Sequence, residues 1–185
     1  RWGTHGDHEM IVLCPSSSQE TYELTIKAFY LSEKLRHPVI LLSDEVVAHS
    51  RERVIIKKQR EQAVERKLAK LGEPHFGGVD STGSAIMPRF GDGHNLLVTG
   101  STHDEKGFRK TSDSEVHDKL VHRITSKITD ARQIIDDFIY GGPETAKWGI
   151  ISFGSTTRSV DELMTSIGSE LSVRTMQLRT VWPFP

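Results

Sequence analysis

The sequence predicts an α/β protein made of parallel-sheet three-layer units, and two observations lead to this class. First, the apolar segments MIVLC and PVILL flank a segment that has the periodicity of an amphipathic helix. Second, the same order of strand, helix and strand returns near the other end of the chain. A strand–helix–strand crossover places its two strands parallel in one sheet and packs the helix against that sheet.

The first crossover unit follows a polar opening segment. We expect Glu9–Cys14 to form a strand that is buried on both faces and ends at Pro15. Ser17 is expected to cap the next helix, with Glu20 at the spacing of a capping box. The segment HPVILLSDE then supplies a second apolar strand, so the sheet is predicted to be parallel. The apolar stripe of the helix consists of Leu24, Ala28, Leu31 and Leu35.

The middle of the chain is polar and is predicted to mark a domain boundary. The segment from Arg51 to Lys70 is densely charged, and Gly, Pro and Ser are frequent in the segment after it. Apolar residues then recur with helical spacing from Ser114 through Phe138. This pattern predicts one long amphipathic helix, which is ended by Gly141 and bridges two domains.

A second crossover unit is predicted after this helix. WGIISFG, at 148–154, is expected to be another buried strand. STTRSVDELMTSIG is expected to be a helix that turns Leu163 and Ile167 inward. VRTMQL then leads into RTVWPFP at the end of the chain.

Composition excludes several classes of function. The chain has 24 Lys and Arg against 25 acidic residues, so its net charge of −1 provides no basic field for nucleic acid and no polybasic patch for a membrane. Its apolar runs are far shorter than the ~20 residues of a membrane-spanning helix. Cys14 is the only cysteine, so it forms no internal disulfide and holds no iron–sulfur cluster alone. We expect a soluble, cytoplasmic protein whose electron-transfer centre lies on another chain. Because no initiator Met precedes Arg1, we also expect the chain to be part of a longer protein.

Two glycine motifs have an ordinary explanation beside a functional one. GDG at 91–93 is half of the motif by which thiamine-diphosphate enzymes hold magnesium, but the paired Asn that should follow it is missing. We therefore interpret GDG as a turn with positive φ angles. GSTTRS at 154–159 begins a predicted helix, where backbone N–H groups can bind an anion. Helix capping alone also explains its hydroxyl residues, and both explanations stay open.

Two histidine groups imitate metal sites. One combines His5, Asp7 and His8, and the other places His103 beside two acidic residues. Neither group has the HExxH spacing or a companion thiolate. We therefore expect polar loops or helix caps and predict no metal site on this chain.

Five stretches carry a resemblance to a known family. They are RWGTHGDH, PSSSQETYELTIKAFYLSEKLRHPVILLSDEVVAHSRE, MPRFGDGHNLLVTGSTHDEKG, FGSTTRSV and LRTVWPFP. Together and in this order they closely resemble the alpha subunit of 2-oxoacid:ferredoxin oxidoreductases, the 2-oxoglutarate type in particular. The resemblance covers nearly the whole chain. HGDHEMIVLCPSSSQE and PVILLSDE are its specific part, whereas GSTTRS alone is weak.

The resemblance implies a division of the chain into three parts. Residues 1–58 would be the C-terminal part of a thiamine pyrimidine-binding domain, and 59–145 a polar linker with the long bridging helix. Residues 146–185 would begin a transketolase-C-terminal-like domain. The glutamate that activates the pyrimidine of the cofactor would lie outside this sequence, so the chain alone is expected to be inactive.

The resemblance also implies cofactors and partners. Such enzymes decarboxylate a 2-oxoacid on thiamine diphosphate, transfer the acyl group to coenzyme A, and pass electrons through iron–sulfur clusters to ferredoxin. The diphosphate and its magnesium ion would be held by a partner beta subunit. The iron–sulfur clusters would lie on that subunit or on small accessory chains.

The opening segment resembles the loop that, in related pyruvate enzymes, holds an arginine facing the substrate carboxylate. That arginine falls near Gly6 here, which has no side chain. We hypothesise that Arg1, as a bidentate fork, or His5, as a donor or proton carrier, supplies the cationic group instead. Thr4 and Asp7 are further candidates on the substrate and cofactor side. The alternative is a loop that packs at a subunit interface.

A second set of candidates follows the second strand, namely Asp44, Glu45, His49 and Arg51. Asp44 and Glu45 lie at the carboxyl end of a predicted parallel strand, the edge where open α/β sheets place ligands. A solvated loop explains these two residues equally well. The resemblance suggests that the segment from His49 to Glu52 is an interface or a cofactor edge.

Two other functions remain open. One is a non-catalytic interaction module that uses the same fold to dock a partner chain. The other is a transketolase-like transferase subunit that needs no iron–sulfur partner. An enzyme subunit confers turnover of a 2-oxoacid, whereas a scaffold only binds.

Overall fold

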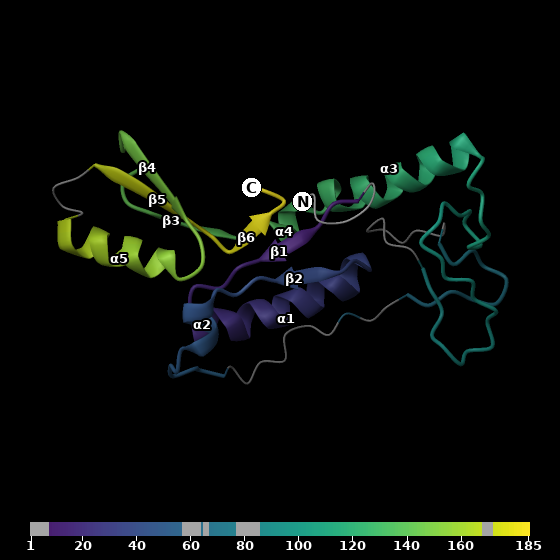
Figure 1. The fold of residues 1–185 in the computed structure, drawn as a ribbon, viewed down its shortest axis with the longest axis horizontal. Helices are drawn as coiled ribbons and strands as arrows, with labels where there is room; N and C mark the ends of the chain where they lie inside the picture. Colours follow the sequence, from purple (N-terminus) through teal and green to yellow (C-terminus); the bar gives the residue numbers. More distant parts are fainter. Residues whose placement is uncertain (1–7, 57–63, 65–66, 77–85, 168–171) are drawn as a thin grey trace. The chain divides into compact units, whose positions relative to one another are not determined.

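A computed structural model describes residues 8–56, 64, 67–76, 86–167 and 172–185 (Figure 1). The chain divides into two compact units. Unit 1 comprises Arg1–Glu9, Leu31–His37 and Ala63–Gln133, and unit 2 comprises Met10–Tyr30, Pro38–Gln62 and Ile134–Pro185. All the strands of the described residues lie in unit 2.

Unit 2 contains a three-stranded sheet with the strand order β2-β1-β6. β1 (Ile11–Leu13) and β2 (Val39–Leu41) run parallel, and β6 (Thr180–Trp182) runs antiparallel to β1. As the central strand, β1 is buried along its whole length, as predicted. The parallel crossover predicted from the sequence is confirmed. The antiparallel third strand was not predicted.

The crossover helix α1 (Ser18–Leu35) begins close to the predicted capping box. The backbone N–H of Glu20 donates to Ser17 Oγ at 3.2 Å, as the spacing predicts. The Glu20 carboxylate reaches back one residue further than expected and accepts the backbone N–H of Ser16 at 2.8 Å. In the predicted apolar stripe, Leu24, Leu31 and Leu35 are buried.

A short helix, α2 (Glu45–His49), follows β2. A second three-stranded sheet of unit 2 then has the order β3-β5-β4. β4 (Trp148–Ser152) and β5 (Val173–Leu178) are parallel, and β3 (Phe138–Gly141) is antiparallel to β5. α5 (Thr156–Ile167) lies between β4 and β5 in the chain and runs along one side of this sheet (Figure 1). The second predicted crossover is confirmed.

The long helix predicted through Phe138 is wrong at its end. α3 (Ser114–Asp130) and α4 (Arg132–Ile135) are separate helices, and Phe138 begins strand β3. Phe, Ile and Tyr, which fill FIYG, favour strands. All four residues of this strand pair with β5, so sheet pairing overrides the helical spacing.

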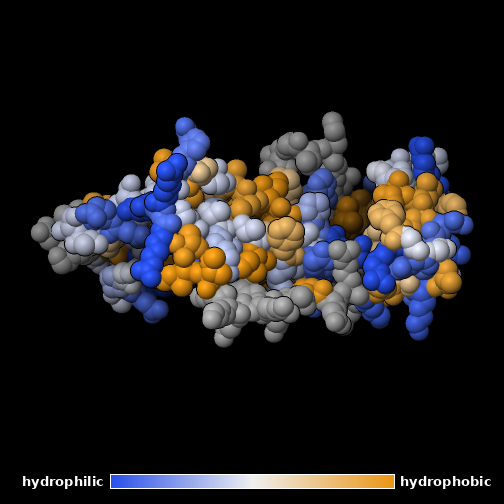
Figure 2. Space-filling view, turned by 90° about the horizontal axis from the view of Figure 1, so that it is seen from below, coloured by the Kyte–Doolittle hydropathy of each residue, from blue (hydrophilic) through white to orange (hydrophobic). Residues whose placement is uncertain are grey.

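Several apolar side chains predicted to be buried are exposed. Trp148 in β4 is 72% exposed and Leu163 in α5 is 40% exposed. The prediction for Ile167 concerns a side chain outside those described. β4 and β2 are edge strands of three-stranded sheets, and α5 runs along one side of the second sheet, so part of their apolar surface has no cover among the described residues. Figure 2 accordingly shows hydrophobic patches among hydrophilic side chains.

α3 is the main helix of unit 1. Asp113 caps it by accepting the backbone N–H groups of Glu115 and Val116, both at 3.1 Å. Lys127 is buried near its end and donates to the backbone oxygen of Arg36 at 3.3 Å. Burial, together with the nearby charges of Arg123 and Arg36, lowers the pKa of Lys127 to about 8.

His37 is a second buried titratable group of unit 1. Its Nε2 lies 2.9 Å from the backbone oxygen of Glu9, and because a carbonyl only accepts, Nε2 carries the proton. Burial, followed by the charge of Lys127, lowers the pKa of His37 to about 4. The ring is therefore neutral at physiological pH.

The GDG motif is a turn, as interpreted from the sequence. Gly91 and Gly93 have φ angles of 93° and 81°, which only glycine adopts without strain. The backbone N–H of Asp92, which lies between the two glycines, donates to the backbone oxygen of Arg89 at 3.3 Å.

The second histidine group forms a polar loop. His103 Nδ1 lies 2.8 Å from Ser101 O, and Asp104 Oδ1 accepts the backbone N–H groups of Lys106 and Phe108. In the described part of the chain, no three His, Cys, Asp or Glu side chains are placed to hold a metal ion. Nor is any described helix both long enough and apolar enough to cross a membrane.

Candidate functional site

Three segments that follow parallel strands come together in unit 2. They contribute Cys14 after β1, Asp44 after β2, and Gly154 with Ser155 after β4. A Cβ atom at Gly154 would lie 2.6 Å from Asp44 Oδ2 and 3.5 Å from Cys14 Sγ. We call Cys14, Asp44, Gly154 and Ser155 the strand-end site. It lies at the edge where α/β sheets place their ligands.

Asp44 holds the strand-end site together. Its Oδ1 caps α2 by accepting the N–H of Val47 at 2.9 Å, and its Oδ2 accepts the N–H of Ser155 at 2.6 Å. Ser155 immediately precedes α5, so a single carboxylate serves the first turns of two helices. The N–H groups of Ser155 and Val47, in that order, hold the pKa of Asp44 below its ordinary value.

Gly154 is required by this arrangement. Its φ of +60° lies in the left-handed region, and a side chain there would collide with the Asp44 carboxylate. The sequence left open whether GSTTRS binds an anion or caps a helix. The structure places an anion of the chain itself, the Asp44 carboxylate, at this helix start.

Replacing Asp44 by Ala is expected to lower the free energy of unfolding by about 1 kcal/mol, because α2 loses its cap and Ser155 N–H loses its acceptor. Asp44 has a depressed pKa in the folded state, so its contribution is present above the unfolded-state pKa and is lost as the pH falls through the folded-state pKa. Urea unfolding at neutral and acidic pH measures both effects.

Glu45→Ala is the matched control for Asp44. The Glu45 side chain is 88% exposed, and His49 Nδ1, on the next turn of the helix, lies 3.9 Å from its carboxylate. Such an exposed contact adds little to stability, so the free energy of unfolding of this variant is expected to stay within about 0.5 kcal/mol of that of the parent protein. Equal losses for the two variants would show that Asp44 has no special structural role.

Cys14 is a protonated thiol within the strand-end site. Burial, followed by the negative charges of Asp44 and Glu20, raises its pKa to about 11, and the N–H of Gly154 opposes this increase. A thiol with this pKa carries almost no thiolate at neutral pH.

The other candidates after β2 face solvent. Glu45, His49 and Arg51 are exposed, whereas Glu52 makes defined contacts. Glu52 Oε2 accepts the N–H of Ser18 at the start of α1, at 2.9 Å, and Glu52 Oε1 lies 2.6 Å from Arg158 Nη1. The hydrogen bond from Ser18 and the charge of Arg158 lower the pKa of Glu52.

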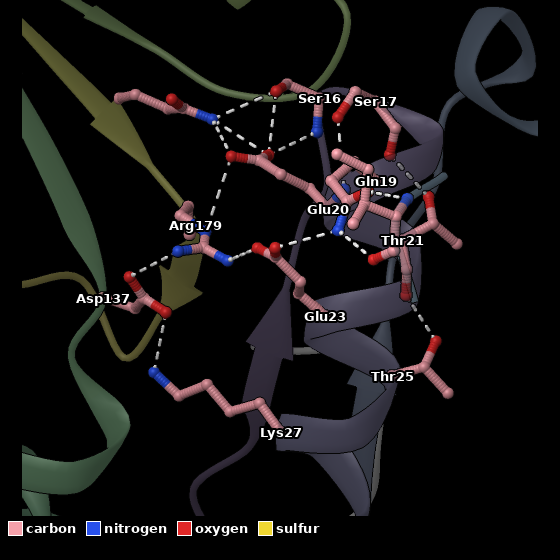
Figure 3. Close-up of polar contacts among 12 residues, drawn as sticks. Ser16, Ser17, Gln19, Glu20, Thr21, Glu23, Thr25, Lys27, Asp137 and Arg179 are labelled. Atoms are coloured by element: carbon pink, nitrogen blue, oxygen red, sulfur yellow. Dashed lines mark hydrogen bonds and ion pairs between the residues drawn. The ribbon is translucent and has the colours of Figure 1, made fainter. Parts of the chain in front are cut away.

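Sequence reasoning missed a polar cluster that joins α1 to β5 and the residues that follow it (Figure 3). Glu20 is its first anchor, because its carboxylate accepts both Ser16 N and Ser16 Oγ at 2.8 Å. Gln177 Nε2 donates to both oxygens of the same carboxylate at 3.0 Å. Gln177 lies 157 residues from Glu20 in the sequence, so no local pattern predicts this contact.

Arg179 is the second anchor of this cluster. Its guanidinium lies 3.1 Å from Glu23, 3.5 Å from Glu20 and 3.6 Å from Asp137. Lys27 closes the cluster with an ion pair to Asp137 at 2.9 Å (Figure 3). Two cations therefore hold three carboxylates together.

The candidates of the opening segment, Arg1, Thr4, His5, Gly6 and Asp7, lie outside the described residues. The first described histidine is His8, whose ring centroid lies 6.5 Å from that of His37. The predicted roles of Arg1 and His5 stay predictions.

Residues 2–123 of this chain match a known protein family. The matching family is described as pyruvate flavodoxin/ferredoxin oxidoreductase, thiamine-diphosphate-binding. A 2-oxoglutarate synthase subunit KorA from Methanothermobacter marburgensis is 41% identical over 188 residues, which cover 100% of this chain and 50% of that protein. KorA from Methanocaldococcus jannaschii is also 41% identical, over 192 residues, with the same coverage. The chain spans about half the length of the curated relatives it matches.

A solved structure matches the fold as well. It is a 2-oxoglutarate:ferredoxin oxidoreductase from Magnetococcus marinus with 2-oxoglutarate, coenzyme A and succinyl-CoA bound. The TM-score is 0.84 at 26% sequence identity, and the match covers 99% of this chain and 33% of that chain.

Proposed function

This chain belongs to the pyruvate flavodoxin/ferredoxin oxidoreductase family of thiamine-diphosphate-binding proteins, and we propose that it is part of the alpha subunit of a 2-oxoacid:ferredoxin oxidoreductase. In the proposed reaction, 2-oxoglutarate and coenzyme A give succinyl-CoA and carbon dioxide. Two electrons leave through iron–sulfur clusters on a partner chain and reduce ferredoxin. The complex would work in the cytoplasm.

The observation that carries this proposal is the 41% identity to a 2-oxoglutarate synthase subunit along the whole chain. A ketoisovalerate oxidoreductase subunit VorB from Methanothermobacter thermautotrophicus is 42% identical, but over only 35% of this chain. The longer match favours 2-oxoglutarate over a branched 2-oxoacid as substrate.

Thiamine diphosphate, when bound, would supply the electron sink for decarboxylation. In the described part of the chain, no three His, Cys, Asp or Glu side chains converge on a point where they could hold a magnesium ion. Ser155 N–H, at a helix start suited to a phosphate, already donates to Asp44. As the resemblance to the family implies, the beta subunit would hold the diphosphate and magnesium, as well as a cluster.

The remaining task of this chain would be to orient the substrate and to bind the partner subunit. Arg1 or His5 would face the substrate carboxylate, with Thr4, Gly6 and Asp7 beside them. The exposed side chains of Glu45, His49 and Arg51 would contribute to the interface or the cofactor edge, while Asp44 fixes the local backbone.

His5→Ala is expected to raise the apparent KM for 2-oxoglutarate by about tenfold, because a charged hydrogen bond to the substrate is lost. The value of kcat should change less. Steady-state kinetics of the assembled complex measure both constants, and His8→Ala is the matched control. An unaltered KM in His5→Ala would reject this role for His5.

The test of the proposed function uses the native complex, purified through a tag on the full-length protein. We expect reduction of a viologen dye that depends on both 2-oxoglutarate and coenzyme A. A stable partner chain without turnover of any 2-oxoacid would favour the non-catalytic module. Turnover without a cluster-bearing partner would favour the transketolase-like transferase.

A further inference from the structure

Unit 1 contains an open pocket of about 560 Å³ that the proposed function does not use. One wall is the face of α3 with Val116, Leu120 and Arg123, and the facing wall comes from the preceding loops with Phe76 and His103. The volume lies in the range of small-molecule sites, which combine apolar walls with a few convergent polar groups. The other charged lining residues are Asp104, Glu105, Lys106 and Lys119.

Two of these charged side chains already have partners. Asp104 Oδ1 accepts the backbone N–H groups of Lys106 and Phe108 at 2.9 and 3.0 Å. Lys119 Nζ lies 2.6 Å from Glu115 Oε1 on the same helix. These contacts shape the wall and leave other groups to recognise a ligand.

His103 Nε2 is a potential hydrogen-bond acceptor that has no donor among the described residues. Its Nδ1 lies 2.8 Å from the carbonyl oxygen of Ser101, and because a carbonyl only accepts, Nδ1 must carry the ring proton. Nε2 of the neutral ring is then a lone-pair acceptor. It is buried and has no hydrogen-bond partner among the described residues. The ring is held edge-on to Phe76, with 4.8 Å between centroids.

The guanidinium N–H donors of Arg123 have no acceptor among the described residues. No hydrogen bond or ion pair joins its guanidinium to any described residue, although the group is partly buried. Burial lowers its pKa, and the charge of Glu105 opposes this effect. The buried Lys127 adds a second positive charge one helical turn further along α3. An oxyanion at Arg123 would satisfy the guanidinium fork and offset this charge.

We propose that this pocket binds a small organic oxyanion, a carboxylate or a phosphate ester, that also carries a hydroxyl group. Arg123 would bind the oxyanion, and His103 Nε2 would accept the hydrogen bond of the hydroxyl. Phe76, Val116 and Leu120 would contact the carbon skeleton. The site is independent of the strand-end site and of the proposed function.

Calorimetric titration of the full-length protein in its native complex tests the site with matched probes. Malate and succinate differ by one hydroxyl, and glycerol 3-phosphate and inorganic phosphate represent the phosphate arm. We expect the hydroxylated member of at least one pair to bind at least tenfold more tightly than its counterpart. Preference within the first pair identifies a carboxylate site, and preference within the second a phosphate site. Equal affinities within both pairs, or no binding, would overturn the proposal.

Three variants and one control link binding to the named side chains. Arg123→Met is expected to weaken binding of the preferred probe at least tenfold. Arg123→Lys should weaken it severalfold, because the lysine keeps the positive charge but lacks the guanidinium fork. His103→Phe should abolish the preference for the hydroxylated probe while keeping a ring against Phe76. Lys110→Met, an exposed residue of the same unit outside the pocket, should bind as the parent does. If Arg123→Met is too unstable to assay, unchanged binding in both Arg123→Lys and His103→Phe would contradict the assignment.

Discussion

Replacing Arg179 by Ala is expected to lower the free energy of unfolding by about 3 kcal/mol. The Arg179 side chain is 18% exposed and lies within 3.6 Å of three carboxylates, those of Glu20, Glu23 and Asp137. Without the guanidinium these like charges face one another in a largely desolvated cluster, and only Lys27 remains to offset them. The loss therefore includes the cost of leaving partly buried charges unpaired.

Urea unfolding followed by circular dichroism measures this loss. Arg179→Lys keeps the charge but cannot reach three carboxylates, so its loss should be intermediate. Arg89→Ala is the control, because the Arg89 side chain is 68% exposed in its pair with Asp92 and should contribute less than about 0.5 kcal/mol. If Arg179→Ala were as stable as Arg89→Ala, the cluster would not hold α1 to β5.

The second large effect is expected in the reactivity of Cys14. With a pKa of about 11, roughly one thiol in a thousand is ionised at pH 8, against about a quarter of the molecules for a free cysteine with a pKa of ~8.5. Alkylation by iodoacetamide in the folded protein should therefore be at least about 100-fold slower than in urea. Mass spectrometry of the peptide that holds Cys14 measures both rates.

The pH dependence separates the ionisation of Cys14 from simple shielding. If the raised pKa limits the reaction, the rate should increase about tenfold per pH unit from pH 7 to pH 10. The same peptide in urea is the control, and its rate should level off near pH 9. A folded-state rate that levels off at the same pH would show that the pKa of Cys14 is not raised.

The sequence predicted the elements whose signals are local. β1, α1 and β2 carry an apolar run, a capping motif and an apolar stripe within one short segment, so their order and parallel pairing followed from spacing, although β1 and β2 are shorter than predicted. The resemblance to the family was confirmed by the match over residues 2–123. The exception among the longer elements was β3, where helical spacing continued into a segment whose conformation depends on pairing with β5.

Contacts between distant segments could not be predicted. Glu20 was expected to follow the capping box, but its carboxylate binds Ser16, and Gln177 and Arg179 contact the same carboxylate from β5 and just beyond. Asp44 was selected by its place at a strand end, yet its partner Ser155 lies 111 residues away. The roles of Arg1 and His5 remain predictions, because they lie outside the described residues.

The central claim is that this chain serves an enzyme that oxidises 2-oxoglutarate, and a substrate comparison tests it most directly. Initial rates of coenzyme A-dependent viologen reduction by the native complex would be measured for 2-oxoglutarate, pyruvate, 2-oxoisovalerate and indolepyruvate. We expect kcat/KM for 2-oxoglutarate to exceed that for each of the others by at least about tenfold, which is the lower end of the discrimination that a single difference between substrates provides. A higher kcat/KM for any other acid, or no turnover with all four, would contradict the account.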